Sequence, residues 1–296
     1  MNRSELPRAL QSGSPALFRR TISLSLRRWR LEAGLTQSDA AYRLARTDGH
    51  ISNIESDRTP SAADMEILLT LYGKDDHIPF MRALLDGAKS KKGWWNALSG
   101  DVPSWFNLFL GLEDGAGEVA SFDSVVVPGL LQTDPYAEAV IRGNPDLSDE
   151  QVRQLVNVRM GRQQILEREE NPIHVSAVID ESVLYRQRGT TQVMEAQLNY
   201  LLEMSKRPRI DIQILPYTAG STPAQDGSTF TVLTFPPEMV DDPGLVYVEL
   251  LTGGKYFEKP AEVSEYRRAL TRLRALAANP QASRGIIRQA MKEVRQ

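Results

Sequence analysis

The sequence of 296 residues contains no cysteine and only three histidines, His50, His77 and His174. The absence of cysteine excludes disulfide bonds, thiolate nucleophiles and cysteine-ligated metals. The histidines lie far apart, and none has a second ligand at the spacing that a metal requires. We therefore expect no metal site and no cofactor.

Long apolar runs are missing as well. No segment approaches the roughly 20 apolar residues that span a bilayer, and the N-terminus lacks the apolar core of a signal peptide. The sequence therefore predicts a cytoplasmic protein that has no membrane partner.

Catalytic motifs are also missing. No nucleophile-elbow pattern is present, so serine hydrolase chemistry has no recognisable centre. The glycines at 253–254 and 111–117 lack the spacing of either phosphate-binding loop. We predict no catalytic residues, and we expect that the protein is not an enzyme.

Charge is divided unevenly along the chain. Residues 1–92 contain 15 Lys and Arg against 11 Asp and Glu, a net charge of +4, whereas residues 93–296 contain 20 against 27, a net charge of −7. A basic head on an acidic body suits a DNA-binding domain that is attached to something else. The length by itself already favours two domains.

Residues 35–55 carry the most specific pattern. Thr36 and Asp39 form a capping box at the start of a first short helix. Thr47 caps a second helix that runs from Asp48 to about Ser56, after a turn at residues 45–47. The pattern predicts a helix-turn-helix.

Flanking segments complete a bundle. Apolar residues at helical spacing predict a helix before this motif, a helix after Ser61 that ends at Gly73, and a fifth helix near residues 77–87. The first 20 residues are polar and mixed, and we expect a loose arm there.

The second helix of a helix-turn-helix lies in the major groove of DNA. Its outward positions are predicted to meet bases, with Asn53 suited to adenine, Asp48 to cytosine and His50 to a base or phosphate. The remaining predicted contacts are sequence-independent: Gln37 at a helix N-terminus and the flanking residues of the second helix. The full predicted DNA-binding set is Gln37, Arg46, Thr47, Asp48, Gly49, His50, Asn53 and Arg58.

Residues 24–72 resemble the Xre-type, phage-repressor-like helix-turn-helix family. The shared skeleton is Leu35-Thr36-Gln37, Ala41, Leu44, Ile51 and Ile54-Glu55. The resemblance implies a lambda-repressor-like all-α fold and double-stranded DNA as partner. Two departures are Ala45, where the family usually has glycine in the turn, and Gly49, which lowers helicity by roughly 1 kcal/mol relative to alanine.

The remainder alternates irregularly between helices and strands. Strands are predicted at 118–127, 173–179, 210–215, 229–235 and 245–251, followed by a turn at 252–255 that leads into residues 256–257. Helices are predicted at 134–142, 148–169, 190–205, 260–278 and 281–295. Because the last strands look like a meander, we predict an α+β domain rather than a doubly wound one.

Several short motifs in this region resemble the C-terminal domain of actinobacterial Scr-type antitoxin-like regulators. They are residues 127–133 with 136–137, 159–163, 178–181, 214–216, 226–230, 246–249 with 252–254, and 266–267. The resemblance implies a small, toxin-like partner protein.

Arginines and carboxylates near predicted strand ends form a candidate partner- or ligand-binding cluster. Its members are Arg159, Arg162, Asp180, Glu181 and Glu249. Two interpretations remain open, because such residues either receive a partner or ligand, or form ion pairs that pin the long helix to the sheet.

The sequence therefore predicts a multidomain protein. Its predicted parts are an arm at 1–20, an all-α helix-turn-helix domain at 21–88, a linker at 89–95 and an α+β domain at 96–296. The predicted function is sequence-specific DNA binding by a transcriptional regulator. A homodimer is expected, because two-fold operators match two-fold proteins. A small partner protein is expected to tune its occupancy of DNA; the alternative is a repressor that senses a small molecule.

Overall fold

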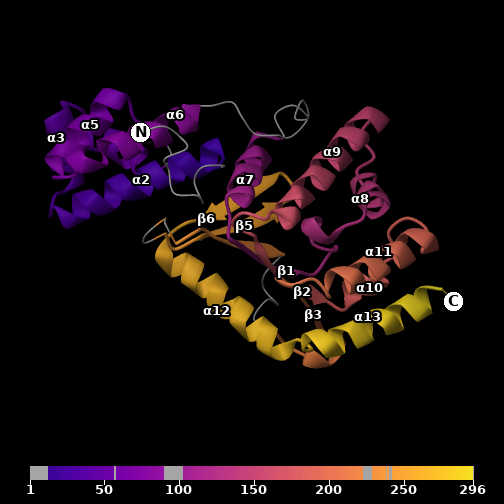
Figure 1. The fold of residues 1–296 in the computed structure, drawn as a ribbon. Coiled ribbons are helices and arrows are strands. Elements are labelled where there is room, and N and C mark those ends of the chain that lie inside the picture. Colours follow the sequence, from indigo (N-terminus) through magenta and orange to yellow (C-terminus); the bar gives the residue numbers. More distant parts are fainter. Residues whose placement is uncertain are drawn as a thin grey trace. The chain divides into compact units, whose positions relative to one another are not determined.

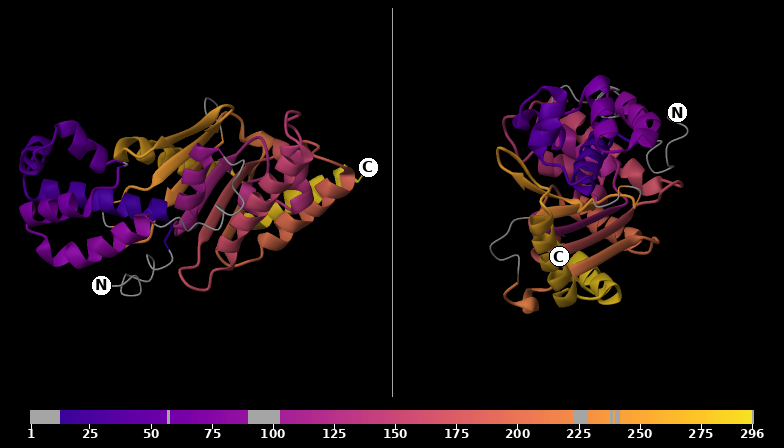
Figure 2. Two further views of the ribbon diagram at one scale, coloured as in Figure 1. Left: turned by 90° about the horizontal axis from the view of Figure 1, so that it is seen from above. Right: turned by 90° about the vertical axis from the view of Figure 1, so that its left-hand side faces the viewer.

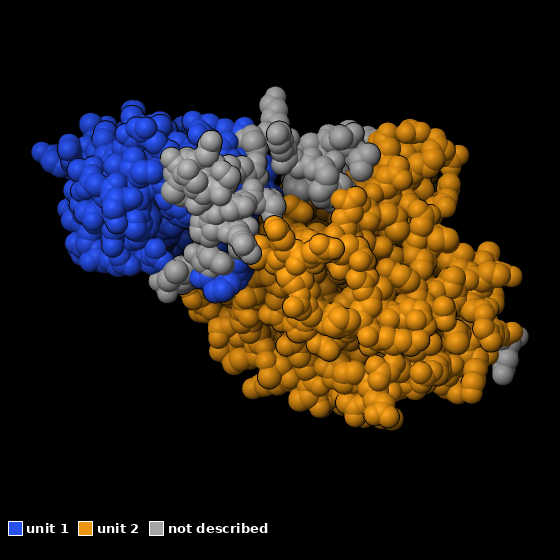
Figure 3. Space-filling view, in the orientation of Figure 1, with its two compact units in different colours: residues 1–93, 235–242 blue, residues 94–234, 243–296 orange. Residues whose placement is uncertain are grey.

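The chain consists of two compact units in a computed structural model that describes residues 13–56, 58–89, 103–222, 229–237, 239 and 242–295. Unit 1 comprises residues 1–93 and 235–242, and unit 2 comprises residues 94–234 and 243–296 (Figure 3). Residues 235–242 were expected to belong to the C-terminal domain, but they are part of unit 1. The predicted linker lies outside the described residues except for Lys89, the last residue of a helix.

Unit 1 is helical in its described residues (Figure 1). Its elements are α2 (Pro15–Glu32), α3 (Gln37–Leu44), α4 (Asp48–Ile54), α5 (Ala62–Leu71), the 3₁₀ helix η2 (Asp75–His77) and α6 (Ile78–Lys89). The predicted caps are present, since the Thr36, Thr47 and Ser61 side chains accept hydrogen bonds from backbone amides of α3, α4 and α5.

The expectation of a loose arm through residue 20 was wrong for residues 15–20, which form the first turns of α2. Ser14 caps this helix and Pro15 occupies its first turn, where a missing N–H costs nothing. Leu17 and Phe18 are completely buried, so they extend the inner face that begins again at Ile22. Residues 1–12 lie outside the described residues.

Unit 2 contains, in its described residues, a six-stranded sheet in the order β3-β2-β1-β4-β5-β6. The strands are β1 (Glu118–Asp123), β2 (His174–Asp180), β3 (Ile210–Leu215), β4 (Phe230–Thr234), β5 (Leu245–Leu250) and β6 (Gly253–Phe257). The last three strands form the predicted antiparallel meander. Strands β1, β2 and β3 are parallel, and the chain crosses between them through helices. The predicted multidomain architecture, helical and then α+β, is confirmed.

Helices cover both faces of this sheet (Figures 1 and 2). They are α7 (Ser104–Asp114), α8 (Asp134–Ile141), α9 (Asp149–Arg162), α10 (Ser182–Tyr185), α11 (Thr191–Met204), α12 (Pro260–Leu276) and α13 (Pro280–Val294), with the 3₁₀ helices η4 (Gly129–Leu131), η5 (Gln163–Glu167) and η6 (Tyr217–Ala219). On one face, Phe122 and Val178 pack with Leu273 of α12. On the other face, Ile179 packs with side chains of α11 and α13.

Two predicted boundaries in unit 2 were wrong, and two helices were missed. Strand β1 ends at Asp123 instead of residue 127, because β4 pairs with it only as far as Phe230. The long helix ends at Arg162 and tightens into η5, as helix C-termini often do. Helices α7 and α10 were not expected.

The turn predicted at residues 252–255 lies instead at residues 251–252, and Gly253 and Gly254 belong to β6. Gly254 is required by packing, because a Cβ there would lie 2.5 Å from the Tyr247 ring. No helix in the described part of the chain is long and apolar enough to cross a membrane.

Candidate nucleic-acid interface and a polar pocket

A buried ion pair holds three helices of unit 1 together. Arg30 of α2 donates two hydrogen bonds to Glu55, which directly follows α4, at 2.6 and 2.7 Å. Gln37 of α3 donates its Nε2 to the same carboxylate at 3.0 Å. The hydrogen bonds that Arg30 donates to Glu55 raise the pKa of Arg30 above its usual value. Two residues of the sequence skeleton, Gln37 and Glu55, therefore fix the helix-turn-helix geometry from inside.

The turn between α3 and α4 depends on one left-handed residue. Ala45 has φ 52° and ψ 46°. This conformation lets the Arg46 amide donate to the Ala41 carbonyl at 2.9 Å, a closure that glycine usually provides. Thr47 then caps α4 by accepting a hydrogen bond from the His50 amide at 3.3 Å.

The outer face of α4 is accessible along its length. Asn53 and Gly49 are exposed, whereas Ile51 and Ile54 on the inner face are fully buried. Asp48 is exposed and accepts a hydrogen bond from Ser38 of α3 at 2.6 Å, which leaves its other oxygen available.

His50 differs from the other predicted contacts. Its ring faces α5, with Nε2 3.6 Å from an Asp64 oxygen, and most of its side chain is buried. The structure therefore places the His50 ring between α4 and α5 and not fully outward.

The two flanking arginines are exposed, and they border one hollow. Arg46 and Arg58 line a depression of about 440 Å³ together with His50, Ser61 and Asp64. Seven of the eight predicted DNA-binding residues therefore lie at least partly at the surface around α4, and Gln37 joins them at the N-terminus of α3.

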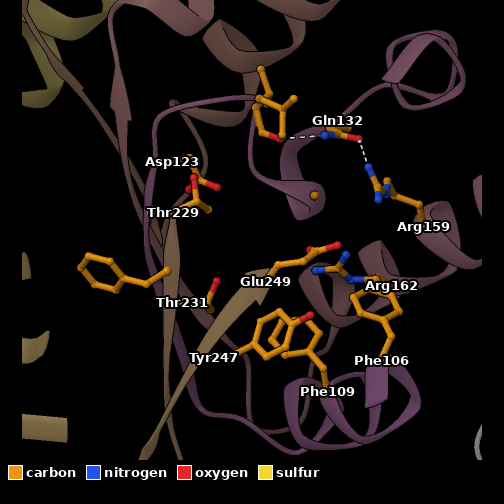
Figure 4. A pocket seen from close by; sticks show the side chains of 14 residues that line it. Phe106, Phe109, Asp123, Gln132, Arg159, Arg162, Thr229, Thr231, Tyr247 and Glu249 are labelled. Atoms are coloured by element: carbon orange, nitrogen blue, oxygen red, sulfur yellow. Dashed lines mark hydrogen bonds between the residues drawn. The ribbon is translucent and has the colours of Figure 1, made fainter. Parts of the chain in front are cut away.

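In unit 2, polar side chains occupy one face at the end of β1, β4 and β5. Ser121 pairs with Thr231, which pairs with Tyr247, so their side chains share a face. Asp123 and Glu249 lie two residues further along β1 and β5, and side chains alternate in a strand. All of these residues except Ser121 line a pocket of about 110 Å³, together with aromatic side chains of α7 and two arginines of α9 (Figure 4).

Arg162 is one of these arginines and is nearly fully buried. It donates to both oxygens of Glu113 in α7, at 2.7 and 2.8 Å. Burial opposes its charge, but the Glu113 carboxylate raises the pKa of Arg162. Gly129 permits this arrangement, because a Cβ there would lie 2.7 Å from Nη1 of Arg162.

Arg159, the other arginine, lies one helical turn earlier. Its Nη1 donates to the Gln132 side chain at 3.0 Å, and Gln132 is in turn fixed by donating to the Val127 carbonyl at 2.7 Å (Figure 4). Burial and the nearby charge of Arg162 lower the pKa of Arg159 to about 10. The site therefore holds a cation that its surroundings only partly compensate.

Asp123 sits on the opposite side of the pocket. Burial raises its pKa from 3.8 to about 7, and the hydrogen bond that it accepts from Ser121 at 2.5 Å offsets only part of this effect. At neutral pH a large share of this carboxyl group is therefore uncharged.

The structure brings together three of the five residues in the predicted cluster, Arg159, Arg162 and Glu249. Asp180 instead accepts hydrogen bonds from Ser182 at the start of α10, and Glu181 accepts one from the Tyr217 amide at 2.8 Å. The alternative hypothesis was that ion pairs pin the long helix to the sheet. In the described residues Arg162 instead pairs with Glu113 of the helix α7, and no ion pair joins Arg159 or Arg162 to a strand.

Sequence reasoning missed Glu113, Asp123 and Gln132. A signal for Asp123 was present, because Ser121 and Asp123 alternate with Ala120 and Phe122 in a strand that is otherwise apolar. Glu113 carried no such signal, since its partner lies 49 residues away.

Two family models match the chain. Residues 22–77 match a helix-turn-helix domain, and residues 106–289 match a domain of unknown function (DUF5753). The chain belongs to the DUF5753 family. The match at residues 22–77 confirms the predicted helix-turn-helix domain. This domain supports a DNA-binding regulator rather than an enzyme. The DUF5753 domain contains the whole polar pocket. No curated protein and no solved structure was found to match the chain.

Proposed function

We propose that this protein is a sequence-specific transcriptional regulator that binds DNA as a homodimer through α4, and that a small partner protein bound to unit 2 sets its occupancy of the operator. The observation that carries this proposal is the exposed face of α4. Asn53 stands on that face while Ile51 and Ile54 anchor the helix beneath it.

The surroundings of α4 favour DNA over a protein groove. Arg46 and Arg58 are exposed on either side of the helix, and cations at these positions attract the phosphate backbone. Gln37 keeps one amide N–H after its bond to Glu55, and the helix α3 directs its N-terminus toward solvent. Both features position the protein on DNA, whereas Asn53 reads sequence.

Dimerisation follows from the size of the reading surface. A single short helix contacts few bases, and repressors of this kind double their contacts by placing two such helices about one helical turn of DNA apart. The operator is therefore expected to be palindromic.

The partner is expected at an exposed apolar edge of unit 2. Strand β6 forms one edge of the sheet, and Leu250 and Leu251 beside it are 51% and 103% exposed. Exposed edges with apolar residues commonly bind another chain. A small toxin-like partner, as the sequence resemblance implies, is a candidate for this surface.

Asn53→Ala tests the base-reading role. Loss of the side chain should cost about 1–3 kcal/mol on the best operator and much less on other sequences, because only a matched base forms the bidentate contact. Binding to the protein's own promoter region and to scrambled DNA, measured by fluorescence anisotropy at several salt concentrations, checks this prediction. Equal losses on every sequence would mean that Asn53 reads no base.

Arg46→Gln is the matched control, because Arg46 is exposed and contacts phosphate in this proposal. It should weaken binding to all sequences alike and lower the salt slope by about 1. Gln37→Ala is unsuitable as a control, since it also removes a hydrogen bond to buried Glu55. Wild-type protein that ignores its promoter at low salt, alone and with a partner, would contradict the whole proposal.

Co-expression tests the partner. We expect a small open reading frame beside this gene, and its product should co-purify with the full chain and shift its affinity for the operator, because coupling requires unequal binding to the DNA-bound and free forms. A complex that forms with unchanged affinity for DNA would refute the regulatory role of the partner.

A further inference from the structure

The polar pocket of unit 2 lies where β1, one of the three parallel strands, meets the antiparallel strand β4. Strands β2 and β3 lie on one side of β1 in the sheet, and β4, which follows them in the sequence, pairs with β1 on its other side. The pocket opens at the carboxyl ends of β1 and β5, where Asp123 and Glu249 lie. In sheets with parallel strands, small molecules typically bind outside the carboxyl ends of those strands, and β1 is one of the three parallel strands here.

The positive group of the pocket is the guanidinium of Arg159, which has N–H donors that are not used in hydrogen bonds to described residues. Among the described residues, Arg159 donates a single hydrogen bond, to Gln132, although the group has five N–H donors. Arg162 beside it is already neutralised by Glu113, so it does not compete for an anion. Arg159 therefore has the capacity to hold a carboxylate through two parallel hydrogen bonds.

The negative group of the pocket is the carboxylate of Glu249. Glu249 extends into the pocket toward Arg162 (Figure 4), whose positive charge attracts it, and it makes no hydrogen bond or ion pair with any side chain in the described parts of the chain. The opposite wall adds less charge, because burial disfavours the charged form of the Asp123 carboxyl group. With the Arg162–Glu113 pair neutral, one positive and one negative group remain, and they point into the same small space.

The rest of the lining limits the size and character of the ligand. Phe106, Phe109 and Tyr247 form an aromatic floor, and the Phe109 and Tyr247 ring centres are 4.3 Å apart. The volume of about 110 Å³ is smaller than the roughly 150 Å³ cavity that holds benzene. The space therefore suits a molecule with a short apolar side chain.

We propose that this pocket binds a small α-amino acid, whose carboxylate pairs with Arg159, whose ammonium group pairs with Glu249, and whose side chain lies on the aromatic floor. A zwitterion matches both charges. A simple anion would be repelled by Glu249, and a simple cation would be repelled by Arg159. Gln132 orients Arg159, and Gly129 lets Arg162 approach, so both are positioning residues.

Calorimetric titration of the full chain with L-alanine and L-valine tests the proposal, and it needs no DNA or partner. Each amino acid should bind, while propionate, which lacks the ammonium group, and L-alaninamide, which lacks the carboxylate, should bind at least about tenfold more weakly. If neither amino acid binds, or if propionate or L-alaninamide binds as well as L-alanine, the proposal is wrong.

Two variants locate the site. Arg159→Lys should weaken binding of L-alanine about tenfold, because lysine cannot form the paired contact, and Glu249→Gln should weaken it similarly. Arg153→Lys on the same helix is the control, because Arg153 is exposed and pairs with Glu150. Since Glu249 is exposed, its substitution leaves folding intact. Unchanged affinity in both pocket variants would overturn the assignment.

Discussion

At the scale of single residues, Ala45 has a strained backbone at a position where the sequence departs from the family's usual glycine. Ala45 closes the helix-turn-helix turn in a left-handed conformation that costs an L-residue with a Cβ roughly 1–2 kcal/mol. The turn keeps this conformation because the Arg46 amide bonds to the Ala41 carbonyl and Thr47 caps the next helix. Alanine at this position therefore lowers the stability of the motif without changing its geometry.

Ala45→Gly is expected to stabilise unit 1 by about 1 kcal/mol, since glycine adopts this conformation freely and loses part of the gain through its more flexible unfolded chain. Hydrogen exchange at the Ile51 and Ile54 amides measures the change. Ala63→Gly in the first turn of α5 is the control and should act in the opposite direction by a similar amount. A destabilised Ala45→Gly protein would show that the strain has been misjudged.

Asp123 gives unit 2 a dependence on pH. Its pKa is raised from 3.8 to about 7 in the folded state, mainly by burial, so the folded state holds a proton that the unfolded state releases between these values. The unfolding free energy of unit 2 should therefore fall as pH rises from about 4 to about 7, by up to about 1.4 kcal/mol per pH unit, and no further above that range.

Asp123→Asn isolates this contribution, because the amide keeps an acceptor for Ser121 and has no proton to lose. The difference in unfolding free energy between variant and wild type, from denaturant titrations at pH 4, 5.5, 7 and 8.5, should grow up to about pH 7 and then stay constant. Parallel pH profiles for the two proteins would rule out Asp123 as the source.

Among the elements, α7 and α9 are joined by the buried Arg162–Glu113 pair, whose side chains are 9% and 2% exposed. Glu113→Gln should destabilise unit 2 by about 3 kcal/mol, because it leaves a buried guanidinium without its counter-charge. Arg153→Gln, which breaks the exposed pair with Glu150, should cost less than about 1 kcal/mol. Chemical denaturation compares the two variants; similar losses would show that burial of the first pair does not matter.

The sequence predicted elements best where their signals are local. Thr36, Ser61 and Ser148 each mark a helix start that the structure contains, because a cap depends on residues only three positions apart. Strand order and the pocket depend on pairing between distant segments. The parallel alignment of β1, β2 and β3, and the meeting of Glu113 with Arg162, therefore had no local pattern from which to be predicted.

At the scale of the whole molecule, the first structural unit is discontinuous in sequence. Residues 235–242, from the connection between β4 and β5, belong to unit 1 together with residues 1–93. Arg20 of α2 donates to both oxygens of Asp242, at 2.8 and 2.7 Å, and its guanidinium lies 5.0 Å from the centre of the Phe235 ring. Unit 1 is therefore completed by a segment that follows β4 and precedes β5 in the sequence.

Asp242→Asn in the full chain is expected to destabilise unit 1 by about 3 kcal/mol, since Arg20 and Asp242 are only 8% and 2% exposed and the substitution removes a buried carboxylate charge that faces the guanidinium. Hydrogen exchange at α2 amides should accelerate, while amides of β2 and β3 keep their protection. Asp211→Asn, which breaks the exposed pair with His174 in unit 2, should leave α2 unchanged. If α2 amides exchange at the same rate in both variants, residues 235–242 contribute nothing to the stability of unit 1. Residues 1–93 alone would then be as stable as the complete unit.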